Sequence, residues 1–475
     1  MARSYVLAGM QFGDEGKGTF VDYISATQKI AQVVRYNGGS QASHTVISPL
    51  GVLHKFSQLG SAMFFDDCRS FLSSNMVVNP FNLIEEVTQF AKKTNQSPQD
   101  VLRRIVIDEN CYIVTPYHKL VNQLREIREG DNRRGSVGTG VSEVRQILRE
   151  INIGLKISDV FNSKVLFETL ASLCDYATSF YEANKQTIAQ NTHDNVRENL
   201  ERGTHFLLNS DSVAKIYEGF QSLFDAHRFN ISQNICTSLH AQDGIVFEGA
   251  QAVLIDEFHG FRPNTTVLDT SIHNALTLCN ELDVNDVIKI GVAKALTSRH
   301  GMGALPTESG ELNGRIVDAN QEVSFWNGAP RFGWFDAILM RYAQSVNNVD
   351  EIYLSWLDKL DSFDKIKICN NYRYADEITE EFNEAFDYEM SNGQAVISDI
   401  RKNTTNISRY LSQCVPIYNV MDGWECDTTQ TRRASDLPRN CHRYIEEIER
   451  LTKLTVSTVS VGPTRNEKLV MAWTL

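Results

Sequence analysis

The chain has 475 residues, of which 42% are hydrophobic and 22% charged, and its formal net charge is −13. This composition is that of a globular protein with a large core, and it excludes an intrinsically disordered chain. The negative charge argues against nucleic acid as a partner, because an acidic surface repels the phosphate backbone. A small phosphorylated ligand can still bind at a local group of basic side chains.

Nine cysteines are scattered along the chain without a C-x-x-C pair. This odd, unpaired set indicates reduced thiols and argues against a disulfide framework or a zinc site. The first residues lack the apolar core and cleavage site of a signal peptide. No apolar run approaches the roughly 20 residues that span a bilayer. We therefore expect a cytoplasmic protein with no membrane partner.

Short apolar runs that end at glycine or polar residues predict buried strands, and runs with helical spacing predict helices between them. In chain order we expect strands at 4–10, 31–36, 104–108, 244–248, 287–292 and 351–355, a hairpin across 46–59, and helices at 17–24, 80–92, 334–346 and 441–452. The 370–400 region is the least patterned. The alternation predicts an α/β fold with a large, mostly parallel central sheet and helices on both faces.

A largely helical stretch with few glycines runs from about residue 157 to 235. We interpret it as an insertion that lies over the sheet. No internal repeat or low-complexity tract divides the chain. We therefore expect a single domain over residues 1–475, similar in class to the P-loop NTPases, with this helical insertion.

The segment 9–19 has the composition of a phosphate-binding turn between a strand and a helix. Three of the six residues at 13–18 are glycine, so backbone amides can approach a phosphate, and Lys17 adds a positive charge. It is not a Walker A loop, which has an earlier glycine and a Ser or Thr after the lysine. A plain glycine-rich turn is the alternative. Asp14 and Glu15 repel phosphate unless they hold a metal ion or move protons.

The same segment closely resembles the signature loop of adenylosuccinate synthetases, since residues 11–18 read QFGDEGKG. Further motifs of that family follow in its order: RYNGG at 35–39, SHTV at 43–46, VTPYH at 114–118, FEGAQ at 247–251, KALTSR at 294–299, GMGALPTE at 301–308, RFGW at 331–334, LD at 357–358 and SVGP at 460–463. The resemblance implies a ligase that joins L-aspartate to C6 of a 6-oxopurine nucleotide. It implies conversion of IMP to adenylosuccinate through a 6-phosphoryl intermediate, driven by GTP or another nucleoside triphosphate, in purine biosynthesis.

The resemblance also implies catalytic roles. Asp14 resembles the general base that takes the purine N1 proton, and it resembles a ligand of Mg²⁺ together with the carbonyl of Ser43. His44 resembles the general acid that acts on the leaving diphosphate. Gln251 is expected to hold the purine O6 region, and Lys17 to contact the phosphates.

The remaining expected site residues bind ligands. For the purine nucleotide and aspartate they are Gln41, Thr139, Arg145, Thr266, Thr297, Ser298 and Arg299. For the triphosphate they are Gly13, Glu15, Gly16, Gly18, Thr19, Arg331, Trp356, Asp358, Ser460 and Gly462. Arg299 is suited to clamp a carboxylate in a bidentate manner. Arg145 is expected to reach the substrate phosphate across the interface of a homodimer.

Three departures from the family pattern bear on the choice of nucleotide. Trp356 stands where the family has a lysine beside the base-reading aspartate, here Asp358. An indole can stack on any purine and so relax base choice toward adenine, or it can simply pack. Gln41 stands where the family has Asn, and Asn264 where it has an aromatic residue.

These departures leave two alternatives beside the reaction on IMP. One is the same ligation on dGMP with ATP or dATP, giving 2-aminodeoxyadenylosuccinate, as in a phage variant of the family. Retention of Asp14 favours a 6-oxopurine with ordinary N1 deprotonation, such as IMP, but dGMP carries the same N1 proton and stays an alternative. The other is a nucleotide-binding protein that has lost catalysis, and the retained acid and base argue against it.

Overall fold

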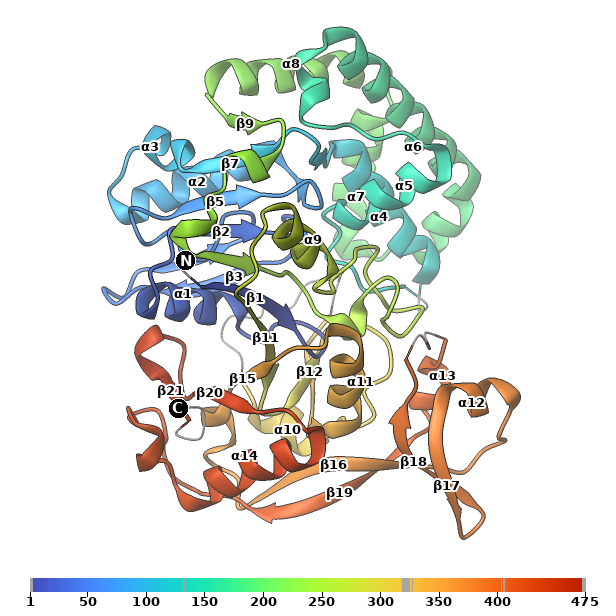
Figure 1. Cartoon of the computed structure of the whole chain (residues 1–475). Helices are drawn as coiled ribbons and strands as arrows, with labels where there is room; N and C mark the ends of the chain where they lie inside the picture. Colours follow the sequence, from blue (N-terminus) through green and yellow to red (C-terminus); the bar gives the residue numbers. More distant parts are fainter. Residues whose placement is uncertain are drawn as a thin grey trace.

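The computed structural model describes residues 3–130, 133–317, 325–326, 328–402, 404 and 406–471. At its centre is a ten-stranded sheet in the order β21-β20-β15-β11-β1-β10-β2-β5-β7-β9, parallel throughout except for the β20–β21 pair (Figure 1). The strands are β1 (Ser4–Gly9), β2 (Gln32–Arg35), β5 (Arg69–Leu72), β7 (Ile105–Asp108), β9 (Asn230–Ser232), β10 (Ile245–Glu248), β11 (Val287–Lys294), β15 (Glu351–Ser355), β20 (Val456–Ser460) and β21 (Lys468–Val470).

Helices cover both faces of this sheet, which is why its inner strands are apolar on both sides. All six residues of β1 are buried. Tyr5 and Leu7 pack with residues of α1 (Lys17–Thr27), whereas Val6 and Ala8 pack with residues of α9 (His273–Glu281). Further helices around the sheet are α2 (Pro80–Thr94), α3 (Pro98–Arg103), α10 (Gly310–Arg315), α11 (Ala337–Asn347) and α14 (Arg439–Thr452).

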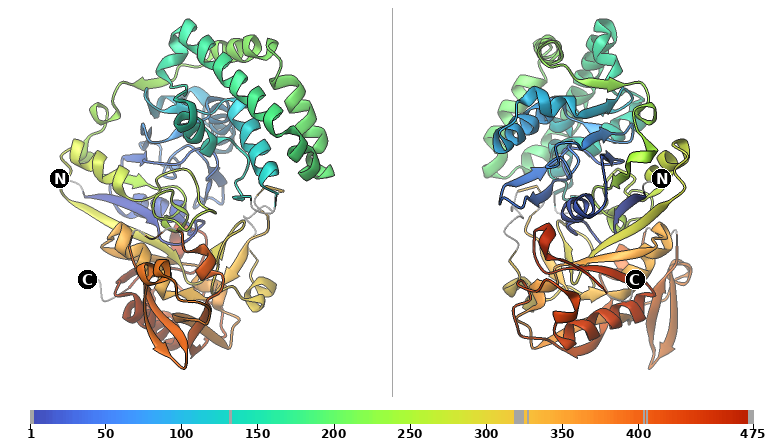
Figure 2. Two further views of the ribbon diagram at one scale, coloured as in Figure 1. Left: turned by 90° about the vertical axis from the view of Figure 1, so that its right-hand side faces the viewer. Right: turned by 60° about the vertical axis from the view of Figure 1, so that its left-hand side comes forward.

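A group of helices lies beside the β5–β7–β9 end of the sheet (Figures 1 and 2). It comprises α4 (Pro116–Glu129), α5 (Val141–Ile151), α6 (Ser163–Asn191), α7 (Asp194–Leu207) and α8 (Asp211–Ala226). Their apolar residues share one core with α2. The expected helical segment thus forms, but its last residues make β9, an edge strand that the sequence analysis did not predict.

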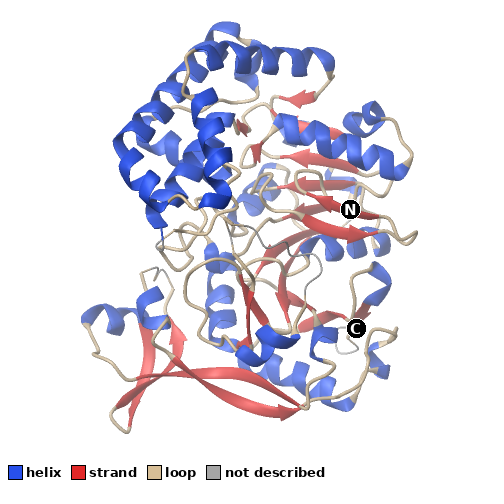
Figure 3. Ribbon diagram, turned by 180° about the vertical axis from the view of Figure 1, so that it is seen from behind, coloured by secondary structure: helices blue, strands red, loops and turns tan. Residues whose placement is uncertain are grey.

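At the opposite end of the molecule a second, smaller sheet forms (Figure 3). It contains β14 (Phe335–Asp336), β16 (Lys365–Tyr374), β17 (Phe386–Ser391), β18 (Gln394–Ile400) and β19 (Val415–Asp422), with α12 (Glu380–Ala385) and α13 (Ser408–Leu411) nearby. Short paired strands complete the fold: β3 (His44–Ile47), β4 (Leu53–Phe56), β6 (Val77–Val78), β8 (Tyr112–Ile113), β12 (Thr297–Arg299) and β13 (Arg331–Gly333).

The α/β fold with a mostly parallel central sheet is confirmed. The helix expected at 334–346 begins later, because Phe335 and Asp336 pair with β16 and the Asp336 carboxylate then accepts the N–H groups of Ile338 and Leu339 as the cap of α11. In the part of the chain that the structure describes, no helix is long and apolar enough to cross a membrane.

Candidate active site

A cavity of about 1030 Å³ opens at the carboxyl ends of the central strands. Its walls come from the residues that follow β1, β10, β15 and β20, the position where ligands bind in open α/β sheets. The predicted site residues that line it are Gly13, Asp14, Glu15, Gly16, Lys17, Gly18, Thr19, Gln41, Ser43, His44, Thr139, Gln251, Thr266, Arg299, Trp356, Asp358, Ser460 and Gly462. The predicted residues outside its lining are Arg145, Thr297, Ser298 and Arg331.

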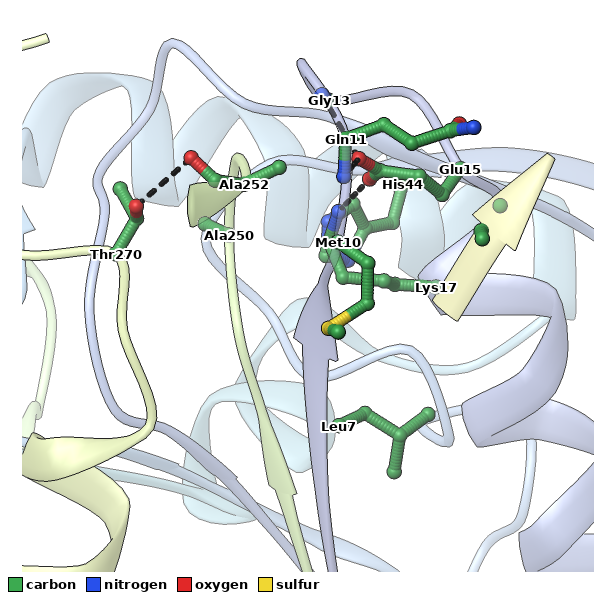
Figure 4. Close-up of polar contacts among 12 residues, drawn as sticks. Leu7, Met10, Gln11, Gly13, Glu15, Lys17, His44, Ala250, Ala252 and Thr270 are labelled. Carbon is green, nitrogen blue, oxygen red and sulfur yellow. Dashed lines mark hydrogen bonds and ion pairs between the residues drawn. The ribbon is translucent and has the colours of Figure 1, made fainter. Parts of the chain in front are cut away.

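The turn from β1 into α1 is held by an internal ion pair (Figure 4). The Glu15 carboxylate accepts the N–H of Gly13 at 2.8 Å and of Gln11 at 3.2 Å, and Lys17 Nζ lies 2.6 Å from its other oxygen. Both charged side chains are buried. Glu15 therefore shapes the loop and balances Lys17, while no side chain caps the amino terminus of α1 beside Gly16.

Asp14 projects from the tip of this turn. Its backbone has φ 59°, in the left-handed region that few side chains adopt, and its side chain is 51% exposed. A carboxylate oxygen of Asp14 lies 3.5 Å from Nε2 of His300. His300 also lines the cavity but was not among the predicted site residues, although it lies between the motifs at 294–299 and 301–308.

His44 begins β3, and its ring contacts a carboxylate that the sequence analysis did not single out. The Nδ1 of His44 is hydrogen-bonded to Glu248, the last residue of β10. The Glu248 carboxylate also accepts the backbone N–H of Ser61 at 2.9 Å and the Ser61 hydroxyl. Burial alone would raise the pKa of Glu248, but His44, Arg35 and Ser61 lower it to about 2. Burial lowers the pKa of His44, and Glu248 opposes that shift in part.

On the β10 side of the turn, polar side chains gather around Gln251. This residue has φ 61°, and its side-chain oxygen accepts a 3.4 Å hydrogen bond from Gln41. Thr266 lies 3.4 Å from Ser142 between their hydroxyl oxygens, and Thr139 lines the same wall. The structure thus brings the predicted purine-nucleotide residues together, with the exception of Arg145.

Arg299 is a buried cation in the cavity wall. Its guanidinium donates to the carbonyls of Ala304 at 2.8 Å and Asn264 at 2.9 Å and lies 4.5 Å from the centre of the Phe12 ring. Within the described residues no carboxylate forms an ion pair with it. Burial and the nearby Arg331 charge hold its pKa well below the usual range of arginine. A buried, uncompensated cation is suited to bind an anionic ligand.

Three of the predicted residues make structural contacts beside this wall. Thr297 donates its hydroxyl to the carbonyl of Trp334 at 3.2 Å, and Ser298 accepts a hydrogen bond from Lys294. Arg331 pairs with Glu308 at 2.8 Å and donates to the carbonyls of Gly301 and Gly303. Arg331 therefore anchors the glycine-rich loop that follows Arg299.

On the β15 side of the turn, Trp356 and Asp358 line the cavity, and Ser460 and Gly462 after β20 continue its wall. Lys294 Nζ lies 4.3 Å from the centre of the Trp356 ring, so one indole face is covered by a cation. Burial raises the pKa of Asp358, which lies 3.7 Å from Nζ of Lys359. Lys359 lines the cavity and was not predicted.

The oxygen donors available to a metal ion are few. Within the described residues no group of three or more His, Cys, Asp or Glu side chains could hold one. Asp14 and Ser43 both line the cavity and offer a carboxylate and a carbonyl. Such a set fits Mg²⁺, which commonly takes one or two protein oxygens and completes its shell with water and substrate phosphates.

Comparisons with known proteins point to one family. The family model of adenylosuccinate synthetase matches residues 6–469. Adenylosuccinate synthetases of Chlorobium chlorochromatii and Desulfitobacterium hafniense are 31% and 30% identical to the chain, over 97% and 98% of it and over 96% and 98% of their own lengths.

Two solved structures share the fold. The fully ligated adenylosuccinate synthetase of Plasmodium falciparum has a TM-score of 0.75 at 20% identity, covering 99% of this chain and all of that one. The succinoaminodeoxyadenylate synthetase of cyanophage S-2L, bound to dGMP and dATP, has a TM-score of 0.54 at 13% identity, covering 99% of this chain and 95% of that one. With the family match over nearly the whole chain, we conclude that the protein belongs to the adenylosuccinate synthetase family, the GTP-dependent ligases that form the C–N bond between L-aspartate and IMP in purine biosynthesis.

Proposed function

We propose that this chain binds IMP on the β10 side of the cavity and the triphosphate on the β15 side, with the transferred phosphoryl group between Asp14 and His44. The observation that carries the proposal is that the Asp14 carboxylate, on the turn between β1 and α1, and the His44 imidazole, at the start of β3, line one cavity. Gln41, Gln251 and Thr266 lie on the purine side, and Trp356 and Asp358 on the other.

The chemistry follows from these positions. The Asp14 carboxylate takes the N1 proton, which makes O6 of the purine nucleophilic toward the γ-phosphoryl group. His44 offsets the negative charge that develops on the leaving diphosphate, together with the amino terminus of α1. Arg299 binds a carboxylate of aspartate, whose amine then displaces the phosphate at C6.

Asp14 and the Ser43 carbonyl would hold Mg²⁺, whose charge, when it is bound, reduces the repulsion between the phosphates and the acidic turn. We further propose that the enzyme is a cytoplasmic homodimer. The position of Arg145 supports the dimer: its guanidinium lies outside the cavity lining of its own chain and donates to the carbonyl of Asn75 at 3.2 Å.

The test combines each of the acceptors IMP, GMP and dGMP with each of the donors GTP, ATP and dATP, in the presence of aspartate and Mg²⁺. Product is followed by the absorbance of the succinylated purine and by phosphate release. We expect turnover with IMP and GTP, and none after chelation of the metal. Turnover of dGMP but not of IMP would overturn the assignment of IMP as the acceptor. Tight nucleotide binding without phosphate release under any combination would overturn the proposal that the protein is catalytically active.

A further inference from the structure

We propose that Glu248 is a positioning residue of the ligation, which holds the His44 ring so that Nε2 serves the cavity. This inference rests on the proposed function. It assigns a role to a carboxylate that lies outside the cavity lining and acts only through His44.

The first argument is the environment of Glu248. Its side chain is fully buried at the carboxyl end of β10, a central strand of the sheet. A buried ionised carboxylate is costly unless its oxygens are satisfied. Here they are satisfied by His44, by the N–H and hydroxyl of Ser61, and electrostatically by Arg35. Because three hydrogen bonds from two residues converge on its two oxygens, the carboxylate is fixed in place.

The second argument is steric. A Cβ added at Gly18, in the first turn of α1, would lie 2.6 Å from Cβ of His44 and 2.9 Å from the Ser61 hydroxyl oxygen. The backbone at the start of α1 therefore lies directly against His44 and Ser61, the two residues that donate hydrogen bonds to Glu248. The His44 side chain is held at two points, by the helix at its Cβ and by the carboxylate at Nδ1.

The third argument is the chemistry of imidazole. Its two ring nitrogens are distinct, and a partner on one of them selects which nitrogen meets the ligand and in which orientation. When Nδ1–H donates to the Glu248 carboxylate, Nε2 is the nitrogen left to meet a phosphate oxygen. A glutamine at position 248 could present its amide N–H to Nδ1, which favours the opposite tautomer.

A double-mutant cycle tests the coupling. Glu248→Gln should lower kcat by about 10- to 100-fold, the usual cost of losing the partner that orients a functional histidine, with little change in KM for IMP. In a His44→Asn background the same change should cost less than about 2-fold, because the residue through which it acts is gone. In an Asp14→Asn background it should cost the full factor. An equal loss in the wild-type and His44→Asn backgrounds would overturn the proposal.

Two further measurements keep the outcome clear. Asp336→Asn alters another fully buried carboxylate, which caps α11 away from the cavity, and should leave kcat within about 2-fold. Nitrogen-15 NMR of histidine-labelled wild-type protein, with His44→Asn for assignment, should find a proton on Nδ1 of His44. A proton found on Nε2 alone would refute the proposal even if Glu248→Gln does not fold. This readout needs no turnover, so it also separates this inference from a failure of the proposed ligation.

Discussion

At the residue scale, the proposed base Asp14 and the proposed acid His44 occupy opposite kinds of environment. Asp14 is half exposed on a strained turn, whereas His44 is buried against Glu248. An exposed carboxylate can reach a ligand and exchange its proton, and a buried imidazole keeps one orientation. The division suits a reaction in which Asp14 meets the purine ring and His44 meets a charged phosphate.

Replacing Asp14 by asparagine keeps the shape of this side chain and removes its basicity. We expect kcat to fall by about 100- to 10,000-fold, the usual contribution of a general base, while the circular dichroism spectrum and the KM for IMP stay close to wild type. Steady-state kinetics with IMP, GTP and aspartate measure the effect. Near-normal turnover would remove Asp14 from the mechanism.

Trp356 is the residue that we expect to decide base choice, because the family resemblance implies a lysine at this position. Its ring packs against Lys294 and lies 6.2 Å from the Phe332 ring, yet it also lines the cavity beside Asp358. We expect Trp356→Lys to raise the ratio of kcat/KM for GTP over ATP by about tenfold, because an ammonium can donate to the guanine carbonyl. The KM for IMP serves as the internal control. An unchanged ratio would mean that Trp356 only packs.

The sequence predicted the site residues whose own chemistry suggests a role. It missed the residues whose proposed role depends on a contact with a side chain far away in the chain. Asp14 and His44 belong to the first group, and both line the cavity. Glu248 lies in the motif at 247–251 and His300 lies between two motifs, but a motif does not show which side chain a residue contacts, and Glu248 is 204 residues from the histidine that it contacts. Only the folded sheet, which places β10 beside β1 and β2, brings that pair together.

At the element scale, the strength of the apolar pattern explains which strands the sequence predicted. Strands buried on both faces, such as β1 and β7, appear as short continuous apolar runs. The strands of the second sheet are partly exposed and rich in polar residues: β16 reads KIKICNNYRY, and β17 is mostly exposed. Such segments lose the apolar signal, so the 370–400 region carried no clear pattern although it folds into strands.

The junction of the phosphate turn with α1 gives a prediction about packing. Gly18→Ala places a methyl group where His44 and Ser61 already lie, so α1 or β3 must shift. We expect kcat to fall at least about tenfold, because a displacement of about 1 Å at a reacting group is costly. Gly314→Ala in α10 is the matched control, since its added Cβ meets no atom within 4 Å. A Gly18→Ala enzyme with wild-type kcat would contradict the close packing of this junction.

At the scale of the whole molecule, the cavity lies between two differently built ends. The helices α4–α8 lie beyond one edge of the central sheet and the second sheet lies beyond the other (Figures 1 and 3). Residues from both halves of the chain line the site, from Thr139 near α5 to Ser460 at the end of β20. The one predicted phosphate ligand on α5, Arg145, instead lies 5.0 Å from the centre of the Tyr112 ring, outside this lining.

If Arg145 serves the cavity of a second copy, two inactive variants should complement each other. In a mixed dimer of Asp14→Asn and Arg145→Leu chains, one cavity has both lesions and the other has neither. Random exchange makes half of the dimers mixed, so activity should recover to about a quarter of the wild-type value, although each variant alone is inactive. The measurement is turnover after partial unfolding and refolding of the mixture, with the separately refolded variants as controls. If Arg145 acts within its own chain, or the protein is a monomer, every cavity keeps one lesion and mixing restores nothing.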